Sequence, residues 1–197
     1  MIYISNNMIQ NKHELIEFIK ADRNRNIVNC SKKYLWIESI LAIFGIVRES
    51  YYVRKYLQTL RLLEYYININ KCSVWKLYYT FKWKRLSNKY QIYIHPNTVG
   101  KGLYIPHFHG GIQLNCLSMG DYCTVSAGVI VGNKGSQENR ATIGNNVELT
   151  IGCKIIGKIK IGDNAVVCPN SVVIKDVTAN AIVSGVPAQI VKIKECQ

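Results

Sequence analysis

Aliphatic residues recur at every sixth position over the second half of the chain. The members of this series are Met119, Val125 and Val131 and, after a gap, Ile143, Leu149, Ile155, Ile161, Val167 and Val173. A period of six fits neither the 3.6-residue period of an α-helix nor the two-residue alternation of an ordinary strand. It is typical of a short strand followed by a tight turn, repeated so that equivalent residues stack.

The residues after the leading aliphatic support this interpretation. Gly144 and Gly162 come next, followed by Asn145 and Asp163, and Gly and Asn tolerate the positive φ of tight turns. A second apolar or small series starts four residues further on. Its members are Val147, a displaced Ile151, Ile159, Ala165, Ser171 and Val177. We therefore predict a parallel β-helix.

Residues 133–142 interrupt the repeat with a polar stretch that has no leading aliphatic. We expect this stretch to leave the β-helix as a loop. Protruding loops on rigid scaffolds commonly carry function.

The first half of the chain has a different period. Residues from roughly 8 to 86 are predicted to be helical; within them Tyr52, Tyr56 and Leu60 recur at a spacing of four, with Arg61 outside that apolar stripe. We expect a helical N-terminal domain over 1–91. A β-helix domain with the extruded loop and a C-terminal tail is expected over 92–197.

The formal net charge is +13, and most of it lies in the first half. Residues 1–91 hold 16 Lys and Arg against 6 Asp and Glu, which suits phosphate-rich partners or an anionic membrane surface. A solvated basic face is the alternative. Because no recognised nucleic-acid motif accompanies the basic residues, we expect no nucleic-acid partner.

Seven cysteines are scattered without a Cys-x-x-Cys pair, which argues against a zinc ribbon or a disulfide framework. They are interpreted as small buried residues in a reducing compartment. The chain shows no signal peptide and no stretch long and apolar enough to span a bilayer. We predict a cytoplasmic protein.

Four passages carry a resemblance to a known family. They are Ile92-Tyr-Ile-His-Pro96; Gly102-Leu-Tyr-Ile-Pro-His107 followed by Gly110-Gly111; the repeats through Ile155–Gly162; and Asn170–Asp176 followed by Val183-Ser-Gly-Val-Pro-Ala188. Over about residues 92–194 the chain resembles the hexapeptide-repeat acyltransferases, and most closely their serine-acetyltransferase-like branch. The resemblance implies a left-handed β-helix and a homotrimer, with acetyl-CoA in the cleft between neighbouring subunits. It also allows two trimers to pair through the helical domain.

The resemblance makes His107 the general base. Imidazole suits that work because its ordinary pKa is near ~6.5, and direct attack on the thioester requires no cysteine nucleophile. His109 lies two residues on, so on a strand it faces the same side and is a candidate substrate contact. The alternative for each is a structural or rim histidine.

Acetyl-CoA contacts are also implied by the resemblance. Gly132 and Gly152 match positions where the family holds the pantetheine arm through backbone groups. Lys175 and Lys192 match positions near the phosphates. No metal is expected.

Three features depart from true serine acetyltransferases. An Asp before the catalytic His is Pro106 here, the Asp that orients that His is Tyr93, and the Asp-Arg-His-Pro loop corresponds to Glu138–Ala141. A free amino acid needs countercharges for its ammonium and carboxylate. We therefore expect a neutral acceptor, the hydroxyl of a sugar in a surface glycan or its precursor. Glu138, Arg140 and Tyr93 are candidate acceptor contacts. The sequence leaves open what orients His107, and Tyr93 and a backbone carbonyl are the candidates.

Three alternatives stay open. The first is serine O-acetylation in cysteine biosynthesis. The second is a metal enzyme similar to the β-helical carbonic anhydrases, with His107 and His109 as ligands. The third is a non-catalytic trimeric scaffold. A peripheral contact between the basic first half and the inner face of the membrane, where glycans are assembled, is a further hypothesis.

Overall fold

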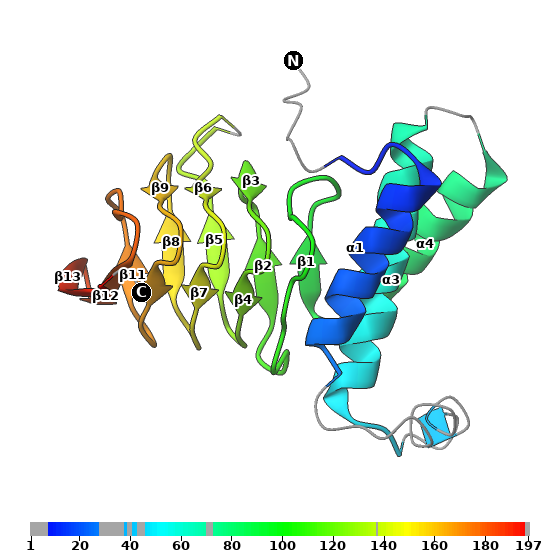
Figure 1. Cartoon of the computed structure of the whole chain (residues 1–197), viewed down its shortest axis with the longest axis horizontal. Coiled ribbons are helices and arrows are strands. Elements are labelled where there is room, and N and C mark those ends of the chain that lie inside the picture. The colour runs from blue at the N-terminus through cyan, green and yellow to red at the C-terminus, as the bar shows by residue number, and fades with distance from the viewer. Residues whose placement is uncertain are drawn as a thin grey trace.

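The computed structural model describes residues 8–27, 38, 41–42, 46–69, 73–136 and 138–195. The helices whose full extent lies within the described residues come first: α1 (Lys12–Arg25), α3 (Glu49–Asn68) and α4 (Val74–Tyr90). The strands that follow are β1 (Ile92–Ile94), β2 (Ile112–Leu114), β3 (Ser118–Met119), β4 (Thr124–Val125), β5 (Ile130–Gly132), β6 (Thr142–Ile143), β7 (Glu148–Leu149), β8 (Lys154–Ile156), β9 (Lys160–Ile161), β10 (Val166–Val167), β11 (Val172–Val173), β12 (Ala181–Gly185) and β13 (Ala188–Ile193). The helices stand side by side at one end of the strand region, and the C-terminal hairpin lies at the other end (Figure 1).

The strands form three sheets, and the chain visits them in turn. The first sheet has the order β1-β2-β5-β8-β11, the second β3-β6-β9, and the third β13-β12-β10-β7-β4. Every pair is parallel except the β12–β13 hairpin that ends the fold. This is the left-handed parallel β-helix, preceded by helices, that the sequence predicts.

Stacking explains the six-residue period. Met119, Ile143 and Ile161 are paired in register on the second sheet, and all three are buried. The second series also keeps a strict spacing of six, because Cys153 takes the place we assigned to a displaced Ile151. Cys153 is fully buried, whereas Ile151 is 55% exposed. The expectation for Ile151 was wrong because it assigned this position to an aliphatic side chain, whereas the thiol of Cys153 packs there as a small apolar group.

The Gly-Asn and Gly-Asp pairs join neighbouring coils. Asp163 Oδ1 accepts a hydrogen bond of 2.6 Å from the backbone N–H of Asn145, and Asn145 Oδ1 accepts one of 2.9 Å from Asp121 N–H. A Cβ on Gly144 would lie 2.2 Å from Asp163 Oδ1. The glycine is therefore required by the close approach of the next coil's side chain.

Arg61 of α3 joins the helices to the first coil. Its Nε donates to Asp22 Oδ2 at 2.8 Å and its Nη1 to Glu64 Oε2 at 3.0 Å, while the carbonyls of Val99 and Gly100 accept at 2.8 and 2.6 Å. Burial disfavours the charge of Arg61, but the attraction of the two carboxylates outweighs burial and raises its pKa. Our placement of Arg61 outside the apolar stripe did not anticipate that it is fully buried. These polar partners, of which all but Glu64 lie far away in the sequence, make its burial possible.

Asp22 and Asn26 extend this polar seam to α1. Asp22 Oδ1 accepts from Leu103 N–H at 3.0 Å, and Asn26 Nδ2 donates to the Leu103 carbonyl at 2.8 Å. Asn26 Oδ1 accepts from Ile105 N–H at 3.2 Å. The helices are thus fixed to the first coil by hydrogen bonds as well as by a shared apolar core.

No helix among the described residues is long and apolar enough to cross a bilayer. The cytoplasmic location expected from the sequence stays a prediction.

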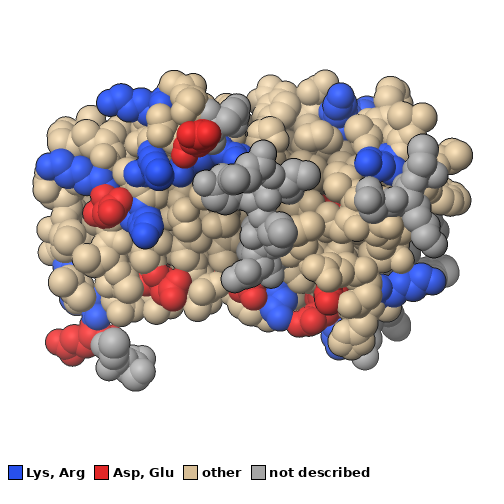
Figure 2. Space-filling view, turned by 90° about the horizontal axis from the view of Figure 1, so that it is seen from above, with Lys and Arg blue, Asp and Glu red and all other residues tan. Residues whose placement is uncertain are grey.

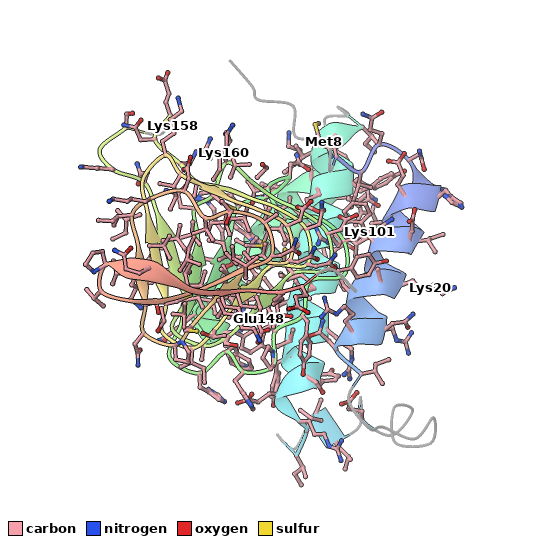
Figure 3. All side chains as sticks on the ribbon, turned by 60° about the vertical axis from the view of Figure 1, so that its left-hand side comes forward. Met8, Lys20, Lys101, Glu148, Lys158 and Lys160 are labelled. Carbon is pink, nitrogen blue, oxygen red and sulfur yellow. The ribbon has the colours of Figure 1, made fainter. Side chains whose placement is uncertain are left out.

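We expect Arg61→Met to lower the free energy of unfolding by about 3–5 kcal/mol, because it leaves two buried carboxylates without their counter-ion. Lys20→Met is the control, since Lys20 points away from α1 into solvent (Figure 3), and a change within about 0.5 kcal/mol is expected there. Urea unfolding at matched protein concentration measures both. Equal effects of the two substitutions would show that Arg61 does not hold the helices in place.

Candidate active site

His107 and His109 lie on the turn between the third and first sheets. The turn follows Tyr104, which bridges to Thr124 of β4, and leads into β2. Phe108 between the two histidines is buried, with its ring centroid 5.6 Å from that of Tyr90. Because Phe108 anchors the turn inward, the side chains on either side of it face solvent, with 69% of His107 and 74% of His109 exposed.

Glu49, the first residue of α3, meets both histidines. Its Oε2 lies 3.0 Å from His107 Nδ1, and its Oε1 lies 2.7 Å from His109 Nε2. Our expectation that the two histidines face the same side is met through this shared carboxylate, although the segment is not a strand. Sequence analysis missed Glu49 because it lies 58 residues before His107 in a helix.

The contact with Glu49 determines which ring nitrogen of His107 is available. A carboxylate accepts hydrogen bonds, so Nδ1 carries the proton and donates to Glu49. In the neutral ring, Nε2 then has the free lone pair. The arrangement provides a base with a fixed orientation, and the second carboxylate oxygen is satisfied by His109.

Tyr93 does not orient His107. Its hydroxyl lies 3.3 Å from Asn88 Oδ1 at the end of α4, and Glu49 takes the role we expected of Tyr93 or a backbone carbonyl. The Tyr93 ring instead lines two cavities on the first sheet. One of 340 Å³ is shared with Trp83 and His95, and one of 230 Å³ is shared with Gly110 and Gly111 beside the histidine turn.

Arg140 and Glu138 lie at the C-terminal ends of the first-sheet strands, whereas the histidine turn lies at their N-terminal ends. We call these two sides the Arg140 edge and the His107 edge of the sheet. Both residues belong to the loop between β5 and β6, which leaves the first sheet toward the second, as does His95 after β1. Glu138 is exposed, whereas Arg140 is half-buried and donates at 3.5 Å to the Cys116 carbonyl of the coil before. Within one chain, these residues are therefore separated from His107 by the width of the first sheet.

The four residues matched to acetyl-CoA binding lie on different strands and turns. Gly132 ends β5, with no atom within 4 Å of where its Cβ would be, so the strip beside the loop has room for a thin ligand. Gly152 is explained by stacking, since a Cβ there would lie 2.2 Å from Asn170 Oδ1. Lys175 is exposed after β11, and Lys192 is exposed on β13.

Three buried cysteines are poor nucleophiles. Burial raises the pKa of Cys116 and Cys153 to about 12 and that of Cys123 to about 11. Cys116, Cys123, Cys153 and Cys168 are free thiols; Cys30, Cys72 and Cys196 lie outside the described residues. In the part of the chain that the structure covers, no three His, Cys, Asp or Glu side chains are arranged to hold a metal ion.

Comparisons with known proteins point to one group of relatives. No family model matches the chain. Serine acetyltransferase from Synechococcus elongatus is 36% identical over 101 residues, which are 50% of this chain and 41% of that protein. The chain thus spans under half the length of that relative.

Solved structures agree. Serine acetyltransferase from Neisseria gonorrhoeae superposes with a TM-score of 0.70 at 23% identity, over 94% of this chain and 68% of that one. Serine acetyltransferase from Brucella abortus in complex with coenzyme A gives a TM-score of 0.67 at 24% identity, over 94% and 71%. These matches confirm the resemblance to the hexapeptide-repeat acyltransferases and their serine-acetyltransferase-like branch.

The relatives contradict the expected sugar acceptor, because they are serine acetyltransferases. That expectation depended on the loss of aspartates at positions 93 and 106 and on the changed loop Glu138–Ala141. The structure explains the change at position 93 only. Glu49 brings a carboxylate to the histidines from a helix, so position 93 need not supply the one that orients His107.

His95 offers a direct test of where Arg140 lies. Burial lowers the pKa of His95, and the positive charge of Arg140 lowers it further. We therefore expect Arg140→Gln to raise the pKa of His95, measured from the pH titration of its ring proton resonances. Lys134→Gln removes the same charge from the same loop and should leave the pKa unchanged. An equal shift in both variants would mean that the loop's net charge, and not the position of Arg140, acts on His95.

Proposed function

We propose, for this member of the hexapeptide-repeat acyltransferases, the transfer of acetyl from acetyl-CoA to the hydroxyl of L-serine. The single observation that carries an acetyl-transfer chemistry is the Glu49–His107 pair, a base with a fixed orientation whose free nitrogen faces solvent. The serine acetyltransferase relatives support the acceptor, and the Brucella abortus relative in complex with coenzyme A supports the donor.

In the proposed reaction His107 Nε2 removes the proton from the serine hydroxyl as that oxygen attacks the thioester carbonyl. The new C–O bond forms, the C–S bond breaks, and the proton passes from His107 to the departing sulfur. Glu49 keeps the ring in its Nδ1–H form and stabilises the imidazolium while it carries the proton. No cysteine takes part, in keeping with the high pKa values of the buried thiols.

The site is proposed to be completed across a homotrimer. Ile130, Ile156 and Ile174 expose apolar side chains, all three from the strands or strand end of the first sheet. Burying them against a neighbour would bring the His107 edge of one subunit to the Arg140 edge of the next. Arg140 then supplies the countercharge for the serine carboxylate, and Glu138 lies at the rim of the cleft.

Acetyl-CoA is proposed to lie along the same cleft. Gly132 leaves room for the pantetheine arm beside the loop, and Lys175 and Lys192 are proposed phosphate contacts, with His109 and Tyr93 lining the acceptor side. Gly152 has no side chain and is proposed to contribute through its backbone groups.

We expect acetyl-CoA-dependent thiol release with L-serine, and a fall in kcat of about 10²–10⁴-fold in His107→Ala. Thiol release is followed with a chromogenic disulfide, and coenzyme A binding is followed by calorimetry.

Glu49→Gln keeps the shape of Glu49 but holds the His107 ring less firmly. It should lower kcat at least about tenfold, with the KM for acetyl-CoA unchanged.

Two results would contradict these roles. Turnover by His107→Ala equal to that of the unaltered protein would exclude His107 as the base. A Glu49→Gln variant that changes KM alone would make Glu49 a binding residue. Thiol release with other hydroxyl acceptors but not with L-serine would refute the acceptor while leaving the chemistry in place.

Mixed trimers test the shared site. His107→Ala and Arg140→Ala subunits, each inactive alone, are unfolded together and refolded at equal amounts. If each site takes His107 from one subunit and Arg140 from its neighbour, about a quarter of the sites regain both groups and activity returns. Sedimentation should show three chains of 22.4 kDa in each variant. Trimers that stay inactive would mean that both residues act in the same subunit.

A further inference from the structure

Helix α4 carries an uncovered apolar face. Val74, Leu77, Tyr78 and Phe81 follow the spacing i, i+3, i+4 and i+7, which places them on one side of the helix. Val74 is 82% exposed, Leu77 73% and Phe81 68%. A contiguous stripe of large apolar side chains on a surface usually marks a contact with another phase or molecule.

The opposite face of α4 is fully used by the fold. Trp83 Nε1 donates to the Tyr56 hydroxyl at 3.2 Å, and the Tyr79 ring stacks on Tyr66 of α3 at 5.5 Å. Leu86 and Tyr90 are buried. Ser73 is the N-cap of the helix, and its Oγ accepts a hydrogen bond of 3.2 Å from the backbone N–H of Trp75. The exposed stripe is therefore held outward by a fixed helix. Among its members, Tyr78 contacts the rings of Trp75 and Tyr79 on the same helix.

The positive charge of α4 indicates that a partner of this face is negatively charged. The helix holds Lys76, Lys82, Lys84, Arg85 and Lys89 and no acidic residue. None of these five cations forms an ion pair with a described residue. Seen from above, the molecule shows Lys and Arg together with Asp and Glu on both the helical half and the β-helix half (Figure 2), so the absence of acidic residues is a property of α4 itself.

An amphipathic helix with large apolar and aromatic residues on one face and only positive charges around them is typical of a helix that lies in the surface of an anionic bilayer. A second copy of the chain fits less well, because two α4 helices would bring ten positive charges together without a negative one. Trp75, which is 56% exposed beside the stripe, adds a side chain favoured at the headgroup level.

We propose that the outer face of α4 docks the protein on anionic lipid. The apolar stripe enters the headgroup boundary while Lys84, Arg85 and Lys89 contact the lipid phosphates. This contact is peripheral, and it is independent of the acetyl-transfer chemistry because it uses none of the residues assigned to the active site.

Co-sedimentation with vesicles tests the proposal on the full chain. We expect binding to vesicles of phosphatidylglycerol and phosphatidylcholine at low salt, and little binding to phosphatidylcholine alone or in 0.5 M salt, where charges are screened to within ~4 Å. The pair Leu77→Gln and Phe81→Gln removes apolar contact, and the pair Lys84→Gln and Arg85→Gln removes charge. Each pair should weaken binding by about tenfold or more.

The matched control is Lys158→Gln with Lys160→Gln, which removes two charges from the β-helix, away from the helices (Figure 3). It should bind vesicles as the unaltered protein does. Helix content and thiol release, unchanged in all variants, would show that each is folded.

Three results would overturn the proposal. The first is no vesicle binding at low salt. The second is binding that weakens equally in the Lys158 and Lys160 control. The third is an unaltered protein that sediments as paired trimers, with Leu77→Gln and Phe81→Gln reducing it to single trimers, which would assign the stripe to a second copy.

Discussion

The buried Arg61 cluster is the interaction on which the rest of the molecule depends. A fully buried guanidinium is tolerated only because two carboxylates and two carbonyls satisfy it. Its partners come from α1, from α3 itself and from the first coil of the β-helix. The cluster therefore fixes a helix onto a β-structure at one place and in one orientation, which apolar packing alone specifies less strictly.

Helix α3, which Arg61 holds in place, also carries a residue of the candidate active site. Arg61 and Glu49 lie twelve residues apart in α3, a distance of about 18 Å along the helix axis. Because α3 is rigid between them, anchoring Arg61 to Val99 and Gly100 carries Glu49 to the histidine turn. The histidine turn itself is anchored by Phe108, which packs against Tyr90 at the end of α4. The base and the carboxylate that orients it are thus brought together by two different structural units.

Repetition explains why the β-helix was predictable. Each coil has the same short sequence pattern. A wrong assignment at one position, such as Ile151 in place of Cys153, therefore leaves the predicted register of the other coils unchanged. The resemblance identified His107 for a similar reason, because its passage is local in sequence. The acceptor was not predictable in that way. The loss of an aspartate at position 93 was interpreted as part of the loss of serine binding, whereas the carboxylate that contacts His107 is that of Glu49, 58 residues earlier in the chain.

The sequence by itself determined the β-helix, its six-residue period, the helical first half and His107 as the candidate base, because each of these follows from residues close together in the chain. Only the tertiary structure decided that Arg61 is buried, that Glu49 orients His107, and that Arg140 and His107 lie on opposite edges of one sheet. It also decided which face of α4 is left uncovered. These are contacts between segments far apart in sequence, and no local pattern of hydropathy or charge encodes which distant partner satisfies a buried or polar group.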